Sequence, residues 1–188
     1  GLEGKTVYLT SSIERRPFRT ISETNPEISY LGNIRLGRNE SLKDIGQALG
    51  RIDRNYVLNV YSNENDPKFC KLFDGDPNIR FCGAVPYREV AKKTVESDIV
   101  VEGFRKKDVD ITRYSLSTKV ADSLSSGVAV FAYGSRDCGA IEYAESVGCI
   151  VTCVEKNELE KSLRSLIFDP ARQKENYEKS AEVVAKNH

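Results

Sequence analysis

The regular alternation of short β-branched runs with amphipathic segments constrains this chain most, since it continues without a break from Ile28 to the C-terminus. We predict strands over residues 28–31, 56–61, 79–82, 99–101, 128–132 and 149–154. Predicted helices lie between and after them, over residues 41–52, 67–73, 87–96, 118–126, 140–147, 157–168 and 170–188. Strands that alternate with helices form parallel sheets with right-handed crossovers. The prediction is therefore an α/β fold, a Rossmann-like doubly wound parallel sheet with helices on both faces.

The region before the first core strand looks different. Residues 1–25 contain one strand-like piece, residues 6–9, and are otherwise polar. We predict that residues 1–25 are a linker or the stub of a preceding domain, that residues 26–169 are the Rossmann-like domain, and that residues 170–188 form a separate C-terminal helix.

Composition excludes several classes of function. The chain has 28 basic and 28 acidic residues, so it has no overall attraction for nucleic acid. It has no apolar run long enough to be a transmembrane segment and no signal-peptide pattern, and we expect a cytoplasmic protein. The five scattered cysteines are predicted to be reduced core thiols. The one histidine is His188, and no metal-ligand set is completed, so neither a metal site nor a histidine base is expected.

The helix predicted over residues 118–126 has the pattern of an anion site. Ser117 or Thr118 can cap it and Gly127 can end it. Lys119 and Asp122 then share a face, beside a helix N-terminus that attracts anions. A phosphate and a sugar hydroxyl are suitable ligands for this pair. The alternative is an exposed helical ion pair with an ordinary N-cap.

Two loops that follow predicted strands add candidate residues. In the first, Gly32 allows a close backbone approach and Arg38 can hold a phosphate, although neither the dinucleotide glycine fingerprint nor a P-loop is present. The alternative is a solvated turn. In the second, the Val85 backbone and the Tyr87 ring can bind a nucleotide base, or the segment can simply start a helix with Pro86. In doubly wound sheets ligands bind at this carboxyl edge.

These segments, in this order, resemble the C-terminal, donor-binding domain of GT-B glycosyltransferases, in particular family 4 (group 1), over nearly the whole chain from Ile28. The resemblance implies that Ser117, Thr118 and Lys119 serve the pyrophosphate of a nucleotide-sugar and that Asp122 binds the ribose. By the same resemblance, Gly32 and Arg38 reach the diphosphate, while Val85 and Tyr87 contact the base.

The chain departs from the family pattern at two positions. Many members have a glutamate where this chain has Tyr114, and Glu102 is a candidate substitute for it. Many also have a basic residue where this chain has Asn33. The polar loop 103–114 is a candidate for donor-sugar contacts, although its charges Arg105, Lys106 and Lys107 are expected to be solvated surface.

The resemblance implies an enzyme, a retaining, metal-independent glycosyltransferase of polysaccharide or glycolipid synthesis, in which Arg38 and Lys119 offset leaving-group charge on a UDP- or GDP-sugar. It needs no cofactor. The resemblance also implies that the chain is a fragment with little activity, because a missing N-terminal domain binds the acceptor. The final helix would pack toward that domain. The full-length protein would be able to associate peripherally with membranes. The alternatives are a non-catalytic Rossmann-like nucleotide-binding or interaction module and, less favoured, an NAD- or FMN-binding oxidoreductase.

Overall fold

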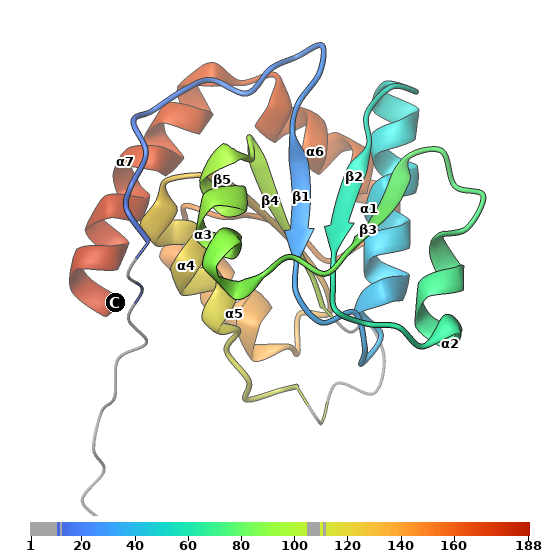
Figure 1. The fold of residues 1–188 in the computed structure, drawn as a ribbon. Helices are drawn as coiled ribbons and strands as arrows, with labels where there is room; N and C mark the ends of the chain where they lie inside the picture. Colours follow the sequence, from blue (N-terminus) through green and yellow to red (C-terminus); the bar gives the residue numbers. More distant parts are fainter. Residues whose placement is uncertain (1–10, 12, 105–109, 111) are drawn as a thin grey trace, which may run out of the picture.

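Six parallel strands form the centre of the molecule, in the order β3-β2-β1-β4-β5-β6 (Figure 1). The structure is a computed structural model that describes residues 11, 13–104, 110 and 112–188. The strands are β1 (Ile28–Leu31), β2 (Leu58–Tyr61), β3 (Ile79–Gly83), β4 (Ile99–Gly103), β5 (Ala129–Tyr133) and β6 (Val151–Cys153). This arrangement confirms the predicted Rossmann-like sheet, whose strand order reverses between β1 and β4.

Helices lie on both faces of the sheet (Figure 1). On one face are α1 (Arg38–Ile52) and α6 (Leu159–Ile167), and beside α1 lie α2 (Pro67–Cys70) and a 3₁₀ turn (Lys71–Phe73). On the other face are α3 (Tyr87–Glu96), α4 (Thr118–Ser126) and α5 (Gly139–Val147). A second 3₁₀ turn, Lys156–Glu158, leads into α6. The last helix, α7 (Pro170–Asn187), packs against α4 and α6. None of the helices in the described residues is long and apolar enough to cross a membrane.

Local sequence signals account for most of the element ends. Helices α3 and α4 have the predicted bounds, and Gly127 ends α4 with a left-handed φ of 74°. Helix α1 begins three residues before the predicted Ser41, because Gly37 takes the N-cap with a φ of 75°. Strand β2 begins later than predicted, since the Tyr56 N–H donates to the Asp53 carbonyl in the preceding turn.

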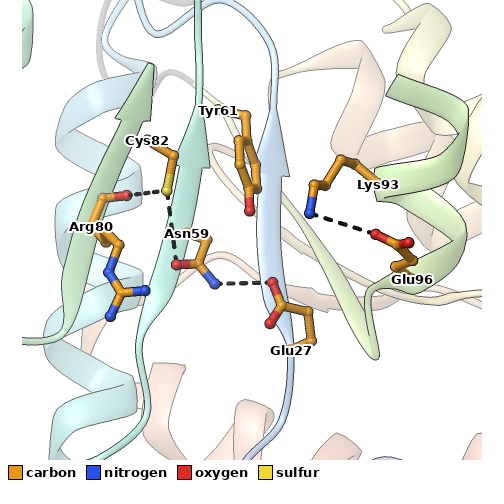
Figure 2. A pocket seen from close by; sticks show the side chains of 7 residues that line it. All are labelled: Glu27, Asn59, Tyr61, Arg80, Cys82, Lys93 and Glu96. Carbon is orange, nitrogen blue, oxygen red and sulfur yellow. Dashed lines mark hydrogen bonds and ion pairs between the residues drawn. The ribbon is translucent and has the colours of Figure 1, made fainter. Parts of the chain in front are cut away.

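The sheet is not covered throughout, which limits the prediction of helices on both faces. Arg80 and Cys82 of β3 are exposed, and together with Asn59 and Tyr61 of β2 they line a polar cavity of about 420 Å³ at the edge of α3 (Figure 2). The prediction that the cysteines are core thiols holds for the buried Cys138, Cys149 and Cys153 and is wrong for Cys82, while Cys70 is half-buried. The alternating pattern of β3, with polar residues facing outward, is the reason.

A strap formed by residues 13–25 lies along the domain beside α7 before it enters β1 (Figure 1). The Arg16 N–H donates to the carbonyl of Ser126 at the end of α4, and its guanidinium donates to the carbonyls of Val95 and Ser97 at the end of α3. Burial lowers the pKa of Arg16 to about 10. The predicted strand 6–9 lies outside the described residues, and the three domain boundaries stay predictions.

Candidate ligand site at the switch point of the sheet

A cavity of about 510 Å³ opens at the carboxyl edge of the sheet, next to the point where the strand order reverses. It is lined by the last residues of β1 and β2, by the loops after β1, β2 and β3, and by the N-terminal halves of α3 and α4: Leu31, Gly32, Asn33, Tyr61, Ser62, Asn63, Val85, Tyr87, Val90, Thr118, Lys119 and Asp122. Six of the eight predicted site residues therefore meet at one cavity. The two exceptions are Arg38 and Ser117.

Helix α4 presents its N-terminus to this cavity because its apolar face is fixed on the sheet. Val120 and Leu124, one turn apart, are buried in the core. Ser117 occupies the N-cap position, but its side chain makes no capping hydrogen bond to the helix among the described residues. Thr118 and Asp122, which lie one turn apart in α4, thereby face the cavity.

Lys119 has a different partner from the one that its spacing suggested. Its Nζ lies 3.0 Å from Oε2 of Glu102, at the end of β4, and 4.1 Å from the centroid of the Tyr30 ring. The Glu102 side chain is 1 % exposed and the Lys119 side chain 27 % exposed. Burial by itself lowers the pKa of Lys119, but the Glu102 carboxylate and Tyr30 outweigh it, so the net pKa is raised. The alternative of an exposed Lys119–Asp122 pair is not what the structure contains.

Gly32 is required by the close approach of Lys119. A Cβ at this position would lie 2.9 Å from both Cδ and Nζ of Lys119, and the φ of Gly32 is 150°. The first loop thus supplies a bare backbone wall to the cavity, and the predicted approach of a phosphate to Gly32 stays a prediction.

Arg38 lies near the switch point without lining the cavity. It is the first residue of α1 and is half-buried. Its carbonyl oxygen would be 3.4 Å from a Cβ added at Gly103, so its backbone lies against the carboxyl end of β4. The predicted role of Arg38 on a diphosphate stays a prediction.

Val85 and Tyr87 form the far wall of the cavity. Both line it, and the Tyr87 side chain is 94 % exposed, so its ring is free to contact a ligand. Pro86 also takes the N-cap position of α3. The two interpretations of this segment are therefore compatible, since the same residues start a helix and wall the cavity.

Ser62 and Asn63, in the loop after β2, line the cavity and were not predicted from the sequence. The loop is held by Glu64, whose Oε2 lies 2.5 Å from Nε of Arg35 in the first loop. The hydrogen bond from Arg35 and those from the backbone N–H groups of Asp66 and Asn65 lower the pKa of Glu64 to about 2. Arg35 is thereby engaged in joining two loops. The available sequence signal was the position of residues 62–63 directly after a strand.

Two further candidates have clear positions. Tyr114, which we compared from the sequence with a glutamate of the family, is 90 % exposed and does not line the cavity. Glu102 is buried behind Lys119. Arg105, Lys106 and Lys107 lie outside the described residues. No group of metal-binding side chains occurs within the part of the chain that the structure describes.

Neither a protein-family model nor a curated protein sequence matches this chain. Solved structures do. WaaG, a glycosyltransferase involved in lipopolysaccharide biosynthesis, is 14 % identical with a TM-score of 0.66, over 88 % of this chain and 44 % of that one. S. aureus TarM, in a complex that contains UDP, is 14 % identical with a TM-score of 0.67, over 95 % of this chain and 36 % of that one.

One shorter solved structure matches this chain over nearly the full length of both. The C-terminal domain of the group 1 glycosyl transferase LpcC from Francisella tularensis is 14 % identical with a TM-score of 0.60, over 93 % of this chain and 94 % of that one. This chain spans less than half of WaaG and of TarM. At this identity the likeness establishes the fold, which is the fold of one domain of these proteins.

Proposed function

We propose that this chain, which shares the fold of a domain found in GT-B glycosyltransferases, binds the nucleotide-diphosphate sugar in a sugar-transfer enzyme. The observation that carries the proposal is the cavity at the switch point, where Gly32, Val85, Tyr87, Thr118, Lys119 and Asp122 come together from separate segments. Parallel α/β sheets bind nucleotides at this position.

The cavity has a suitable surface for each part of such a donor. Tyr87 and Val85 offer an apolar wall for the base, and Asp122 offers a carboxylate for the ribose hydroxyls. The N-terminus of α4 and the bare backbone at Gly32 can approach the diphosphate. In the proposed reaction Arg38 offsets the charge that develops on the leaving diphosphate, whereas the positive charge of Lys119 faces the Glu102 carboxylate.

The remaining parts of the proposal concern the whole protein. We infer a retaining, metal-independent cytoplasmic enzyme of polysaccharide or glycolipid synthesis whose N-terminal domain binds the acceptor, and which associates peripherally with membranes. Support comes from the likeness to WaaG, which is involved in lipopolysaccharide biosynthesis, and from the match of this chain to only part of WaaG and TarM.

Calorimetric titration of the chain with UDP, GDP and ADP tests the donor site. We expect one of them to bind saturably and Arg38→Ala to weaken it about 10- to 100-fold, because a hydrogen bond to a charged group contributes about 1.5–3 kcal/mol. Arg51→Ala is the matched control, since Arg51 belongs to the last turn of the same helix and pairs with Glu160 on the surface. Arg38 is a cleaner test than Lys119, whose removal would strand the buried Glu102.

Binding that is equally strong in Arg38→Ala and in Asp122→Asn would contradict the donor site. Binding by the chain, combined with no sugar transfer by the full-length protein, would favour the alternative of a non-catalytic nucleotide-binding module.

A further inference from the structure

The charge of Lys119 is already neutralised inside the protein. Its Nζ has less than 1 Å² of accessible surface and lies 3.0 Å from Oε2 of Glu102, on β4. Neither atom has a hydrogen-bond partner of good geometry within the described residues, so the contact is an ion pair in which both atoms keep hydrogen-bonding capacity. Only the stem of Lys119 lines the cavity.

The pair is not free to separate. Glu102 is 1 % exposed, and a buried carboxylate that loses its cation suffers a large desolvation penalty. Gly32, directly after β1, lies against the side chain of Lys119, and the Tyr30 ring faces the Lys119 ammonium group. A ligand in the cavity therefore encounters Lys119 and Glu102 together, as a neutral pair.

The two nucleotides of a sugar-transfer reaction differ in the charge on their phosphates. A nucleotide-diphosphate sugar carries about two negative charges on its diphosphate, because the terminal phosphate is esterified. The nucleoside diphosphate that remains after transfer carries about one more at neutral pH, since a terminal phosphate loses its second proton near pH 6. An unbalanced lysine would attract the product more strongly than the donor.

We propose that Glu102 is a specificity-determining residue that cancels the charge of Lys119, so that the site favours the nucleotide-diphosphate sugar over the more highly charged nucleoside diphosphate. This inference rests on the function proposed above. Its consequence is that product leaves the site readily, at the cost of a weaker hold on the diphosphate.

The test is the ratio of two dissociation constants, that of the nucleoside diphosphate divided by that of its sugar ester. Calorimetry without divalent cations would use UDP with UDP-glucose, GDP with GDP-mannose, and ADP with ADP-glucose. Glu102→Gln leaves the pair with one positive charge and should lower this ratio about tenfold, as expected for one added charge at short range. Glu102→Ala also leaves Lys119 with one positive charge and should lower the ratio, and it serves if Glu102→Gln does not fold.

The double variant Glu102→Gln/Lys119→Gln is again neutral, and we expect it to return the ratio to that of the unmodified chain. Asp44→Asn is the matched control, since Asp44 is also paired with a lysine, Lys156 at 2.6 Å, but does not line the cavity. It should leave the ratio unchanged.

The possible failures are distinct. If the unmodified chain binds none of these nucleotides, the proposed function and this inference both fall. If it binds them but the single variants weaken both ligands in proportion, Glu102 has only a structural role and this inference alone is overturned.

Discussion

At the scale of single residues, the site depends on residues whose side chains, or lack of one, are dictated by their close neighbours. Gly32 has a φ of 150° and no room for a Cβ beside Lys119, and the side chain of Glu102, the partner of Lys119, is 1 % exposed. Each of these residues is defined by what lies against it, which is why substitutions there are informative.

Gly32→Ala should both destabilise the domain and weaken nucleotide binding. The added methyl group forces the Lys119 side chain to move, and the φ costs about 1–3 kcal/mol in a residue with a Cβ. Urea denaturation and nucleotide titration measure the two effects. Gly75→Ala is the control, because Gly75 also has a positive φ, of 76°, but open space around it. Equal effects of the two substitutions would show that the contact with Lys119 does not matter.

Glu64→Gln should lower stability in a manner that depends on pH. The folded-state pKa of Glu64 is about 2, below its ordinary value of 4.5, because of Arg35 and the neighbouring backbone N–H groups. A depressed carboxyl pKa contributes stability that is complete above the unfolded-state value and disappears as the pH falls through the folded-state value. The difference in urea midpoint between the variant and the parent chain should therefore shrink as the pH falls from 4.5 toward about 2. A difference that is constant over this range would contradict the assignment; Glu175→Gln, on α7, is the control.

At the scale of elements, the two ends of α4 have different surroundings. Its N-terminus walls the cavity, whereas its C-terminus is held by the strap. The guanidinium of Arg15 donates to the Leu124 carbonyl at 3.1 Å and to Oγ of Ser180 at 2.9 Å, and it lies 4.1 Å from the centroid of the Tyr177 ring. A cation at a helix C-terminus interacts favourably with the helix dipole. The strap therefore joins α4 to α7.

Arg15→Ala should loosen the C-terminal end of α4 without unfolding the sheet. We expect a loss of about 1.5–3 kcal/mol in the free energy of unfolding, the contribution of hydrogen bonds to a charged group, and faster amide exchange in the last turn of α4. Glu14→Ala, at the exposed neighbouring position, is the control. Unchanged exchange in α4 would mean that α7 alone holds this helix end.

At the scale of the whole molecule, the strap, α6 and α7 meet at one buried side chain. Nε2 of Gln173 donates to the carbonyls of Leu166 and Ile167, each at 2.9 Å, and its Oε1 accepts from the N–H of Ile21 at 3.0 Å. One amide thus satisfies the end of α6 and fixes the strap against α7. Through this side chain the strap is joined to the two C-terminal helices α6 and α7.

Gln173→Leu should lower the unfolding temperature by several degrees. It leaves three buried backbone groups without this partner, at about 1–3 kcal/mol for each group that stays unsatisfied. For a chain of this size about 2–4 °C are lost per kcal/mol. Calorimetry measures the shift, and Lys174→Leu on the exposed side of α7 is the control. Equal midpoints for the two variants would contradict this role.

The sequence by itself determined the order and type of the elements and the helix ends of α3 and α4, because periodicity and caps such as Gly127 are local properties. It also identified six residues that line one cavity, since the carboxyl ends of parallel strands share an edge.

Only the tertiary structure decided the partners. Lys119 pairs with Glu102 and not with Asp122, Arg35 is engaged by Glu64, and Arg15 caps a helix 109 residues away. Nor did the pattern show that the outer face of β2 and β3 is uncovered beside α3. Such contacts depend on how distant segments pack, and a charged side chain has several opposite charges within reach in the sequence. Burial decides which of these opposite charges becomes the partner, because a charge that is withdrawn from water is strongly destabilising unless it is paired.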